Sequence, residues 1–478
     1  MYLGIDIGTS GVKAVRMDPS GRLVQAASVA LTISHAAPGW SEQAPEDWWQ
    51  AVCRAVRQLD GLGDVRAIGL SGQMHGAVLL DGAGAVLRPA ILWNDGRCSA
   101  ECAAVWRDAP DLAQVAGVRP MPGLTGPKLA WVAVHEPQVH ARIRHLLLPK
   151  DYIGYRLHGR FVTDRGDAGG SFLFDQARGR WSDALCAATR TDPAWLPEVL
   201  AGIEVAGTLT AQAAEALGLP GGLPVVAGAA DAPAGALAAG VVRDGRGMIS
   251  LGTSGQFLVA AQSYSAAPDQ GLHSFAHTLP DTWYHMAALL NGARPMQWFA
   301  DMVQAPVAAL LDEAAVTDQG IPLFLPYLTG ERTPHGDDTI RAGFYGIGNA
   351  TTRGQMLRGV LDGIAYAFAD AAQVVGDQMP PPEVMLVQGG GARSPLLLQT
   401  IADVIGLTLA RIAGAEAGPA IGAARLAAVA DGAMTLDDLA QQPETDLTIT
   451  PGDMGRHGAR LQAYRQMYQA LKPLRGSV

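Results

Sequence analysis

The chain has 478 residues, of which 35 are basic and 45 are acidic, and its formal net charge is −10. This length predicts two or three domains. A hydrophobic content of 49% with only 17% charged residues excludes a wholly disordered chain. The acidic balance argues against a nucleic-acid-binding or anionic-membrane surface. The four cysteines are too few for a disulfide framework, and the least charged stretch, 216–242, is broken by Asp231 and by many Gly and Pro residues. We therefore expect no membrane span and a cytoplasmic protein.

The chain opens with the pattern of a strand, a turn of small residues and a second strand. Apolar segments at 2–7 and 12–17 flank this turn, and a third apolar segment at 23–29 follows an Asp-Pro-Ser-Gly turn. These three segments predict an antiparallel meander. Apolar residues at helical spacing predict a helix over 45–59, and the apolar run at 65–70 predicts a buried strand.

An internal repeat is the most informative feature of the sequence. The tetrapeptide Gly-Thr-Ser-Gly occurs at 8–11 and again, 244 residues later, at 252–255, each time after an apolar segment. Ser250 stands where Asp6 stands in the first copy. One copy per domain is the simplest interpretation, and a polar break separates the two halves. We therefore predict two domains, at 1–243 and 244–478.

The second half of the chain predicts elements of its own. Apolar residues recur at helical spacing over 353–375, and a short apolar strand at 385–387 leads into the glycines 389–391. A segment of small residues at 418–424 predicts a surface for close helix packing. A final helix is predicted over about 458–471, and whether it packs back on the first half is left open.

The two Gly-Thr-Ser-Gly turns predict phosphate binding. Small residues at the end of a strand let backbone N–H groups approach a phosphate closely, and Thr and Ser hydroxyls add donors. One such turn is a weak indication, because any hairpin can use it, but two in corresponding positions are a much stronger one. The predicted phosphate-binding residues are Thr9, Ser10 and Gly11 in the first turn and Gly252, Thr253 and Ser254 in the second.

Two aspartates are candidates for the chemistry. Asp6 ends a strand beside the first turn, where its carboxylate would repel phosphates unless Mg²⁺ lay between them. The alternative interpretation is that Asp6 only accepts hydrogen bonds from the backbone of its own turn. Asp231 is the only charged residue between Glu215 and Arg243, and an unpaired buried carboxylate is costly. It is either a general base that accepts a proton from a substrate hydroxyl or a helix N-cap before Pro233, and these two roles are compatible.

Three further loops follow predicted strands. Met74 and His75 lie in a polar loop suited to the recognition of hydroxyl groups. Trp93 and Asp95, with a nearby arginine, supply an aromatic face, a carboxylate and a forked donor, which are the groups that a sugar needs. The turn at 389–391 can host a nucleotide, although its spacing is not Gly-x-Gly-x-x-Gly. Each loop also has an ordinary structural interpretation, because single His and Trp residues and Gly-rich turns are common.

Several nucleotide-binding motifs are absent. No Gly-Lys dipeptide occurs, so there is no Walker A loop, and the lack of His-Arg-Asp and Asp-Phe-Gly excludes a protein-kinase fold. The sequence instead resembles the FGGY family of carbohydrate kinases over essentially its whole length. The segments that carry the resemblance are 4–11, 71–76, 91–97, 123–131, 250–255, 323–335, 342–362 and 389–391.

This resemblance implies an actin-like, two-domain α/β fold built from duplicated ribonuclease-H-like cores, with ATP and a sugar meeting in a central cleft. The implied reaction is ATP-dependent phosphorylation of D-xylulose on its 5-hydroxyl, and a homodimer is plausible by resemblance alone. The implied roles are catalytic base for Asp231, Mg²⁺ positioning for Asp6, ketose contact for Met74 and His75, with Trp93 and Asp95 as weaker candidates, and adenosine binding for Gly389, Gly390 and Gly391.

Two alternatives stay open. Ala232 follows the implied base at a position where members that phosphorylate xylulose often have Asn, so the substrate could be another ketose or polyol, such as ribulose or glycerol. The second alternative is an actin-like ATPase that transfers phosphate only to water. The loop of Met74 and His75 argues against this second alternative, because a pure ATPase needs no sugar pocket.

Overall fold

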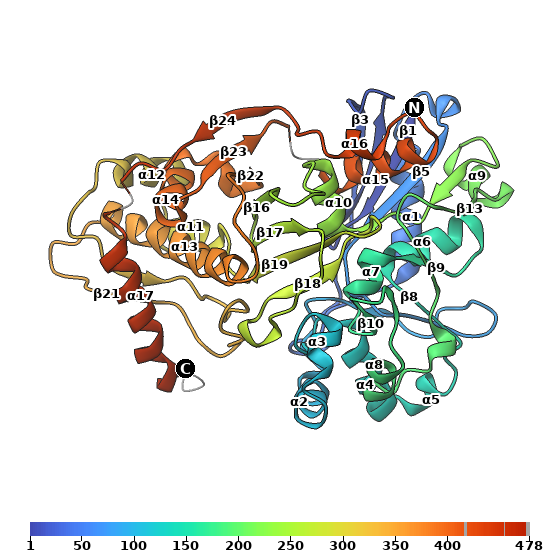
Figure 1. Ribbon diagram of the computed structural model, residues 1–478, viewed down its shortest axis with the longest axis horizontal. Helices are drawn as coiled ribbons and strands as arrows, with labels where there is room; N and C mark the ends of the chain where they lie inside the picture. The colour runs from blue at the N-terminus through green and yellow to red at the C-terminus, as the bar shows by residue number, and fades with distance from the viewer. Residues whose placement is uncertain (415–417, 454, 475–478) are drawn as a thin grey trace.

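The computed structural model describes residues 1–414, 418–453 and 455–474. The described chain forms two α/β domains that lie side by side, each built around a mixed sheet (Figure 1). The expected two-domain α/β fold is thereby confirmed. Over these same residues, we find no helix that combines the length and the apolar character needed to span a membrane.

The sheet of the first domain has seven strands within the described ranges. They are β1 (Tyr2–Ile7), β2 (Gly11–Met17), β3 (Leu23–Ala30), β5 (Ala67–Gly72), β13 (Val205–Thr208), β14 (Pro224–Val226) and β15 (Ala229–Ala230). Their order is β13-β14-β5-β1-β2-β3, with β15 also paired to β5. The expected antiparallel meander of β1, β2 and β3 is confirmed, and β5 and β14 run parallel to β1.

The sheet of the second domain also has seven strands in the part of the chain that is described. They are β16 (Gly247–Leu251), β17 (Gly255–Ala261), β18 (His273–Ala276), β19 (Trp283–Leu289), β22 (Val384–Gln388), β23 (Thr408–Ile412) and β24 (Thr445–Ile449). Their order is β18-β19-β17-β16-β22-β23-β24. From β19 to β24 this sheet matches the first sheet strand for strand, including the two parallel pairings and the antiparallel edge. The Gly-Thr-Ser-Gly repeat therefore marks a duplicated sheet, with one turn after β1 and the other after β16.

Helices cover both faces of each sheet. The outer face of the first sheet packs against α1 (Pro45–Val56), α6 (Pro149–His158) and α9 (Ala211–Leu217). The outer face of the second sheet packs against α13 (Arg353–Gly376) and α14 (Pro395–Ile405). Two helices, α10 (Asp231–Ala238) and α15 (Gly418–Ala430), lie between the sheets. The helices predicted over 45–59 and 353–375 are thus confirmed, although α1 ends at Val56.

Small residues allow α15 to lie directly on the first sheet. A Cβ atom on Gly4 of β1 would lie 2.0 Å from a carbonyl oxygen of α15, and one on Gly69 of β5 would lie 1.9 Å from another. On its opposite side α15 meets α10, where a Cβ atom on Gly422 would lie 2.0 Å from a carbonyl oxygen. The predicted close-packing surface at 418–424 is confirmed. Although α15 is near the end of the chain, it lies against β1 and β5 (Figure 1).

The final helix, α17 (Gly458–Leu471), has the predicted bounds. It packs on the second domain, against α13 and β20 (Leu323–Leu325). Its Tyr464 hydroxyl lies 2.7 Å from the hydroxyl of Tyr327, and both side chains are fully buried. The possibility that this last helix packs on the first domain is therefore wrong, because its buried tyrosines face partners in the second; the returning segment is α15.

Smaller elements complete the described chain. The strands are β4 (Glu42–Gln43), β6 (Val78–Leu80), β7 (Ala90–Ile91), β8 (His145–Leu147), β9 (Val162–Asp164), β10 (Phe174–Asp175), β11 (Arg180–Trp181), β12 (Glu198–Leu200) and β21 (Gly343–Tyr345). The helices are α2 (Ser99–Asp108), α3 (Leu112–Ala116), α4 (Thr125–His135), α5 (Pro137–His140), α7 (Arg165–Gly169), α8 (Asp183–Ala188), α11 (Arg294–Met302), α12 (Val307–Ala315) and α16 (Leu436–Leu439).

Candidate active site

A cavity of about 530 Å³ lies where the two domains meet, and we call it the interdomain cavity. It brings together seven of the residues selected from the sequence, from both domains. These are Thr9, Met74, His75, Trp93, Asp231, Thr253 and Ser254. The turn after β1 and the turn after β16 thus face one cavity, with Asp231 in its wall.

Asp231 is placed by the end of the first sheet. The short strand β15 pairs with β5, and α10 begins at Asp231, so Ala230 and not Asp231 holds the N-cap position. An Asp231 carboxylate oxygen accepts a hydrogen bond of 2.8 Å from the N–H of Ala232, which fixes the side chain. Burial, together with the negative charge of Asp6, raises the pKa of Asp231 to about 7. A carboxyl group with this pKa is suited to accept a proton near neutral pH.

Asp6 is the second carboxylate of the site. It lies on β1 beside Ser71 of β5, and its Oδ1 atom is buried without a hydrogen-bond partner in the described structure. Burial raises the pKa of Asp6 to about 6. No group of three or more His, Cys, Asp or Glu side chains that could hold a metal exists among the described residues. The unpartnered Oδ1 atom of Asp6 is the kind of single oxygen ligand that fits Mg²⁺, which commonly binds through one or two carboxylates, substrate phosphates and water.

The first turn offers backbone donors to an anion. The N–H groups of Thr9 and Ser10 donate to no acceptor in the described ranges, whereas the N–H of Gly8 closes the turn on the carbonyl oxygen of Gly11 at 3.0 Å. Gly11 starts β2, and a Cβ atom there would lie 2.8 Å from the carbonyl oxygen of Val29. Neighbouring free N–H groups in such a turn form an anion-binding concavity.

The hydroxyl of Thr9 is already used within the protein. It donates to Gln73 Oε1 at 3.0 Å and accepts from the indole N–H of Trp93 at 2.9 Å. Gln73 donates onward to Gln43, whose amide group donates to the carbonyl oxygen of Thr9 at 2.9 Å. This closed ring of hydrogen bonds fixes both the turn and Trp93, and it leaves the backbone N–H of Thr9 as the donor available to an anion. No sequence signal pointed to Gln43, and Gln73 was indicated only as part of the polar segment 71–76.

The second turn is held by a loop that the sequence did not reveal. The N–H of Gly292 donates to the carbonyl oxygen of Thr253 at 2.9 Å, and the N–H of Ala293 donates to that of Gly252 at 2.8 Å. The N–H groups of Thr253 and Ser254 find no acceptor in the described ranges and are free for an anion. A Cβ atom on Gly292 would lie 2.3 Å from the carbonyl oxygen of Ser254, so only glycine fits there.

The glycines at 389–391 lie directly behind this second turn. Gly389 has a φ of +99°, and a Cβ atom there would lie 2.7 Å from the backbone of Leu251. A Cβ atom on Gly391 would lie 2.8 Å from the side chain of Ala293. Gly389 and Gly390 are exposed. The structure thus places Gly389, Gly390 and Gly391 next to Gly252, at the edge of the interdomain cavity rather than in its wall.

Met74 and His75 form the opposite part of the cavity. The backbone of His75 has a φ of +70°, which is uncommon for a residue other than glycine. Its carbonyl oxygen accepts from the buried ammonium of Lys128 at 2.7 Å, and its Nδ1 lies 2.6 Å from the carbonyl oxygen of Gly170. Burial lowers the pKa of His75 well below 6.5, so the ring is neutral. Because Nδ1 must then carry the proton, Nε2 is left as an acceptor for a hydroxyl group.

Asp95 does not face the interdomain cavity. Its two carboxylate oxygens accept hydrogen bonds from the guanidinium of Arg97, at 2.8 and 2.6 Å, and from the N–H of Ser41, at 2.6 Å. The guanidinium that the sequence offered as a sugar donor binds this carboxylate instead. Its neighbour Asn94 lines the cavity. Other lining residues that sequence reasoning missed are Gln256, His273, Arg294 and Arg332, of which only Arg332 lies in a segment that carried the family resemblance.

A buried charge cluster lies next to β15, the strand that ends just before Asp231. Lys150 forms ion pairs with Asp151, with Asp164 at 3.0 Å and with Asp167 at 3.6 Å. Asp167 belongs to α7, which packs on β15. Burial raises the pKa of Asp167 well above its ordinary value, and the charge of Asp231 contributes to this shift.

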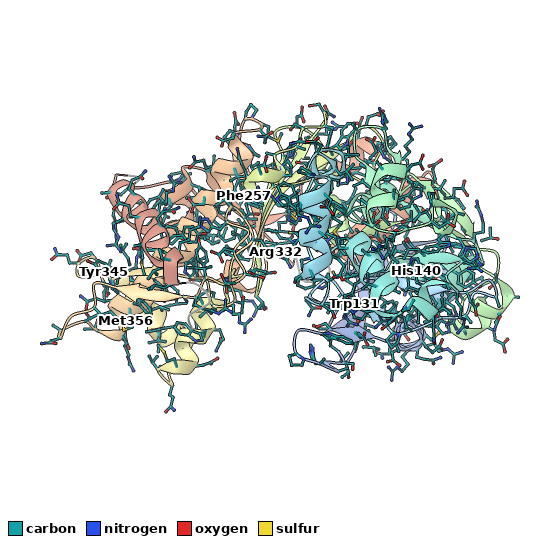
Figure 2. All side chains as sticks on the ribbon, turned by 90° about the horizontal axis from the view of Figure 1, so that it is seen from below. Trp131, His140, Phe257, Arg332, Tyr345 and Met356 are labelled. Carbon is teal, nitrogen blue, oxygen red and sulfur yellow. The ribbon has the colours of Figure 1, made fainter. Side chains whose placement is uncertain are left out.

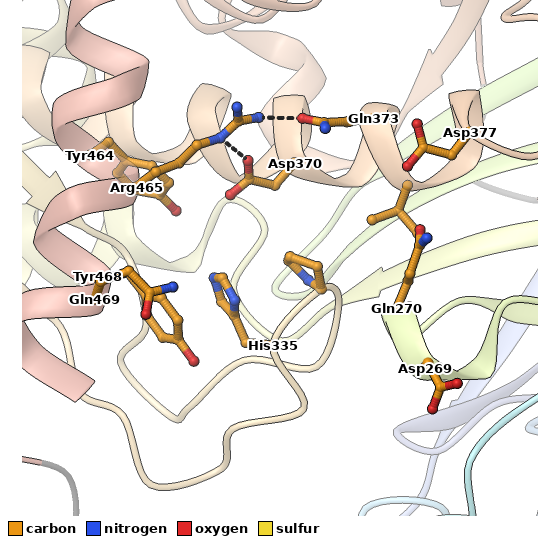
Figure 3. Close-up of a pocket in the computed structure, with 12 residues that line it drawn as sticks. Asp269, Gln270, His335, Asp370, Gln373, Asp377, Tyr464, Arg465, Tyr468 and Gln469 are labelled. Atoms are coloured by element: carbon orange, nitrogen blue, oxygen red, sulfur yellow. Dashed lines mark hydrogen bonds and ion pairs between the residues drawn. The ribbon is translucent and has the colours of Figure 1, made fainter. Parts of the chain in front are cut away.

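A separate cavity of about 500 Å³ lies in the second domain between α13 and α17 (Figure 3). Arg465 of α17 crosses it and donates to Asp370 at 2.8 Å and to Gln373 at 2.7 Å. His335 stacks on Tyr468, with ring centroids 3.7 Å apart. Its lining includes none of the residues predicted for phosphate or sugar binding.

Comparison with known proteins agrees with this geometry. Residues 1–238 match the N-terminal domain of the FGGY family of carbohydrate kinases, and residues 247–430 match the C-terminal domain. The chain belongs to this family. It is 41% identical to the xylulose kinase of Escherichia coli (strain K12), over 99% of this chain and 100% of that protein. As a member of the FGGY family it is a phosphotransferase.

Solved structures extend the comparison to the fold. A xyloylose kinase from Brucella ovis is 38% identical and superposes with a TM-score of 0.95 over 99% of both chains. A glycerol kinase from Plasmodium falciparum with ADP has a TM-score of 0.89 over 98% of both chains at 18% identity, which shows likeness of fold alone. The chain therefore has the two-domain fold of both of these kinases.

Proposed function

We propose that this FGGY kinase transfers the γ-phosphoryl group of ATP to the 5-hydroxyl of D-xylulose. The observation that carries the proposal is the position of Asp231 in a cavity walled by both phosphate turns and by Met74 and His75. The full-length similarity to the xylulose kinase of Escherichia coli supports the choice of sugar.

Asp231 acts as the general base. As the sugar oxygen attacks the γ-phosphorus, the bond from that phosphorus to the ADP oxygen breaks and the hydroxyl proton passes to a carboxylate oxygen of Asp231. The raised pKa of about 7 gives this carboxylate the basicity it needs near neutral pH. Phosphoryl transfer depends mainly on positioning and charge stabilisation, so few further groups are required.

The two turns hold the triphosphate. Thr9, Thr253 and Ser254 line the cavity from two domains, and their N–H groups and that of the adjacent Ser10 donate to no acceptor in the described ranges and would bind phosphate oxygens. Gly11, Gly252 and the glycines 389–391 would let the nucleotide approach the chain closely. Asp6 is the residue that would hold Mg²⁺, with its unpartnered Oδ1 atom. When bound, the cation would offset the charge of the phosphate oxygens.

Met74, His75 and Trp93 orient the ketose. Neutral His75 accepts a sugar hydroxyl through Nε2, and Trp93, fixed by Thr9, offers an apolar face. Asp95 supports this wall through its bonds to Arg97 and Ser41. Ala232 lines the cavity with only a methyl group, so it cannot make the polar contact with the sugar that an Asn at this position would make. This favours a second candidate substrate, another ketose or polyol.

Cytoplasmic location and a homodimer belong to the same proposal, and light scattering of the purified protein tests the dimer.

A coupled assay of ADP release tests the function. The purified protein is given MgATP and, separately, D-xylulose, D-ribulose, glycerol or no sugar, and the phosphorylated product is identified by mass spectrometry. We expect turnover to be highest with D-xylulose and lowest without sugar. ADP release that does not depend on sugar, with no phosphosugar formed, would contradict the proposal and favour an ATPase.

A further inference from the structure

Arg332 is a charged residue of the second domain that the mechanism above does not use. It lies in the loop 330–335, between β20 and β21, and Figure 2 shows it where the two domains face each other. It lines the interdomain cavity and also an adjoining cavity of about 440 Å³. Arg332 therefore forms part of the wall between these two spaces.

The shared wall lies on the sugar side of the site. Trp93, Asn94, Met121, His273 and Leu290 line both cavities together with Arg332. The general base Asp231 and the turn residues Thr9, Thr253 and Ser254 line only the interdomain cavity. Arg332 thus shares a wall with Trp93, which the proposed function assigns to the ketose, whereas the other proposed ketose contacts, Met74 and His75, line only the interdomain cavity.

The guanidinium group of Arg332 has no protein acceptor in the described structure. Its carbon atom lies 5.6 Å from the centre of the Trp93 ring, across the domain boundary. The backbone is fixed, because the N–H groups of Leu290 and Arg332 both donate to Glu331 Oε1, at 2.6 and 2.8 Å. On the same wall, the Nδ1 atom of buried His273 also has no partner among the described residues. Two polar groups without partners on one wall indicate a polar ligand.

We propose that Arg332 binds the carbonyl end of the ketose, through the C2 oxygen and the C1 hydroxyl, while Asp231 holds the 5-hydroxyl at the other end. This inference rests on the proposed function. The flat fork of a guanidinium presents two parallel N–H donors, which match two neighbouring oxygens of this kind. The sugar then bridges the two domains, so that binding of the sugar favours closure of the cavity around it.

Kinetics with two sugars test this role. D-xylulose is compared with 1-deoxy-D-xylulose, which lacks the C1 hydroxyl, on the wild type and on Arg332→Ala and Arg332→Lys. With D-xylulose we expect Arg332→Ala to raise KM about 10- to 150-fold, as for loss of hydrogen bonds from a charged donor, with KM for ATP nearly unchanged. Arg332→Lys keeps the charge but loses the fork, so about a 3- to 10-fold increase remains. With the deoxy sugar the effect of Arg332→Ala is several-fold smaller.

Controls separate this role from folding and from the function itself. Arg341→Ala removes an exposed arginine of the same segment and leaves both KM values unchanged, and thermal melting checks that each variant is folded. An unchanged KM for D-xylulose in folded Arg332→Ala, or an equal loss with both sugars, overturns the inference while the proposed function stands. Lack of wild-type turnover with D-xylulose overturns the proposed function and this inference together.

Discussion

Replacing Asp231 with Asn changes activity and stability in opposite directions. The amide is nearly isosteric and its oxygen still accepts the hydrogen bond from the N–H of Ala232, but it cannot accept the hydroxyl proton. Loss of a general base lowers kcat by about 10²- to 10⁴-fold. The amide can still hydrogen-bond the 5-hydroxyl, and the rest of the sugar and ATP bind other groups, so both KM values stay within about three-fold of the wild type.

The expected gain in stability follows from the pKa of Asp231. It is about 7 in the folded protein, against about 3.9 in the unfolded chain. The folded state therefore binds the proton more tightly, and the free energy of unfolding falls as pH rises from about 4 to about 7. The cost of the ionised carboxylate is complete above pH 7 and absent below about pH 4. At about 1.4 kcal/mol for each pKa unit, and allowing for partial exposure, the variant gains about 1–4 kcal/mol at pH 8.

Calorimetry without nucleotide or Mg²⁺ measures this gain. For a domain of this size it corresponds to a rise in Tm of about 2–10 °C at pH 8, and the rise shrinks as the pH approaches 4. Asp183→Asn is the matched control, because Asp183 also begins a helix but is exposed, and we expect it to change neither Tm nor kcat. A drop in Tm, or wild-type kcat in Asp231→Asn, would refute the assignment of Asp231 as a buried base.

Three further predictions test the surroundings of the site. Trp93→Phe removes the 2.9 Å hydrogen bond to Thr9 and should lower kcat/KM for ATP about 3- to 10-fold in steady-state assays. Gly69→Ala places a methyl group 1.9 Å from a carbonyl oxygen of α15, so we expect Tm to fall sharply or the protein to be insoluble. Gly63→Ala, where the added methyl group meets open space, is the control and keeps the wild-type Tm. Because the pKa of His75 is well below 6.5, KM for the sugar stays flat from pH 8 to pH 6; a rise of about four-fold would contradict a neutral ring.

The sequence was most informative where the pattern is local. Apolar segments on either side of a small-residue turn predicted β1 and β2, and an identical tetrapeptide predicted a matching turn in a second domain. Helical spacing predicted α13 nearly to the residue, and the predicted bounds of the last helix match α17. These features depend on neighbours within a few positions along the chain, and tertiary contacts did not override them.

Contacts between distant segments were beyond the sequence. Asp95 has the chemistry of a sugar ligand, but the fold brings the N–H of Ser41, 54 residues away in the sequence, within 2.6 Å of its carboxylate, which also binds Arg97. Arg332 of the second domain lies near the Trp93 ring of the first only because the fold brings the loop 330–335 to the domain boundary. The hydroxyl of Thr9 looked free for phosphate, but the fold brings Gln73 within 3.0 Å of it. In each case the partner is fixed by three-dimensional packing rather than by residue type.

The position of α15 has a consequence for biosynthesis. One face of the first sheet is covered by α15, which ends at Ala430. The ribosome therefore has to synthesise nearly the whole chain before this face of the sheet can be covered. Until then β1 and β5 present an apolar surface that chaperones or other nascent chains can bind. We therefore expect the first half of the chain, expressed alone, to expose this apolar surface and to aggregate rather than to fold as an independent domain.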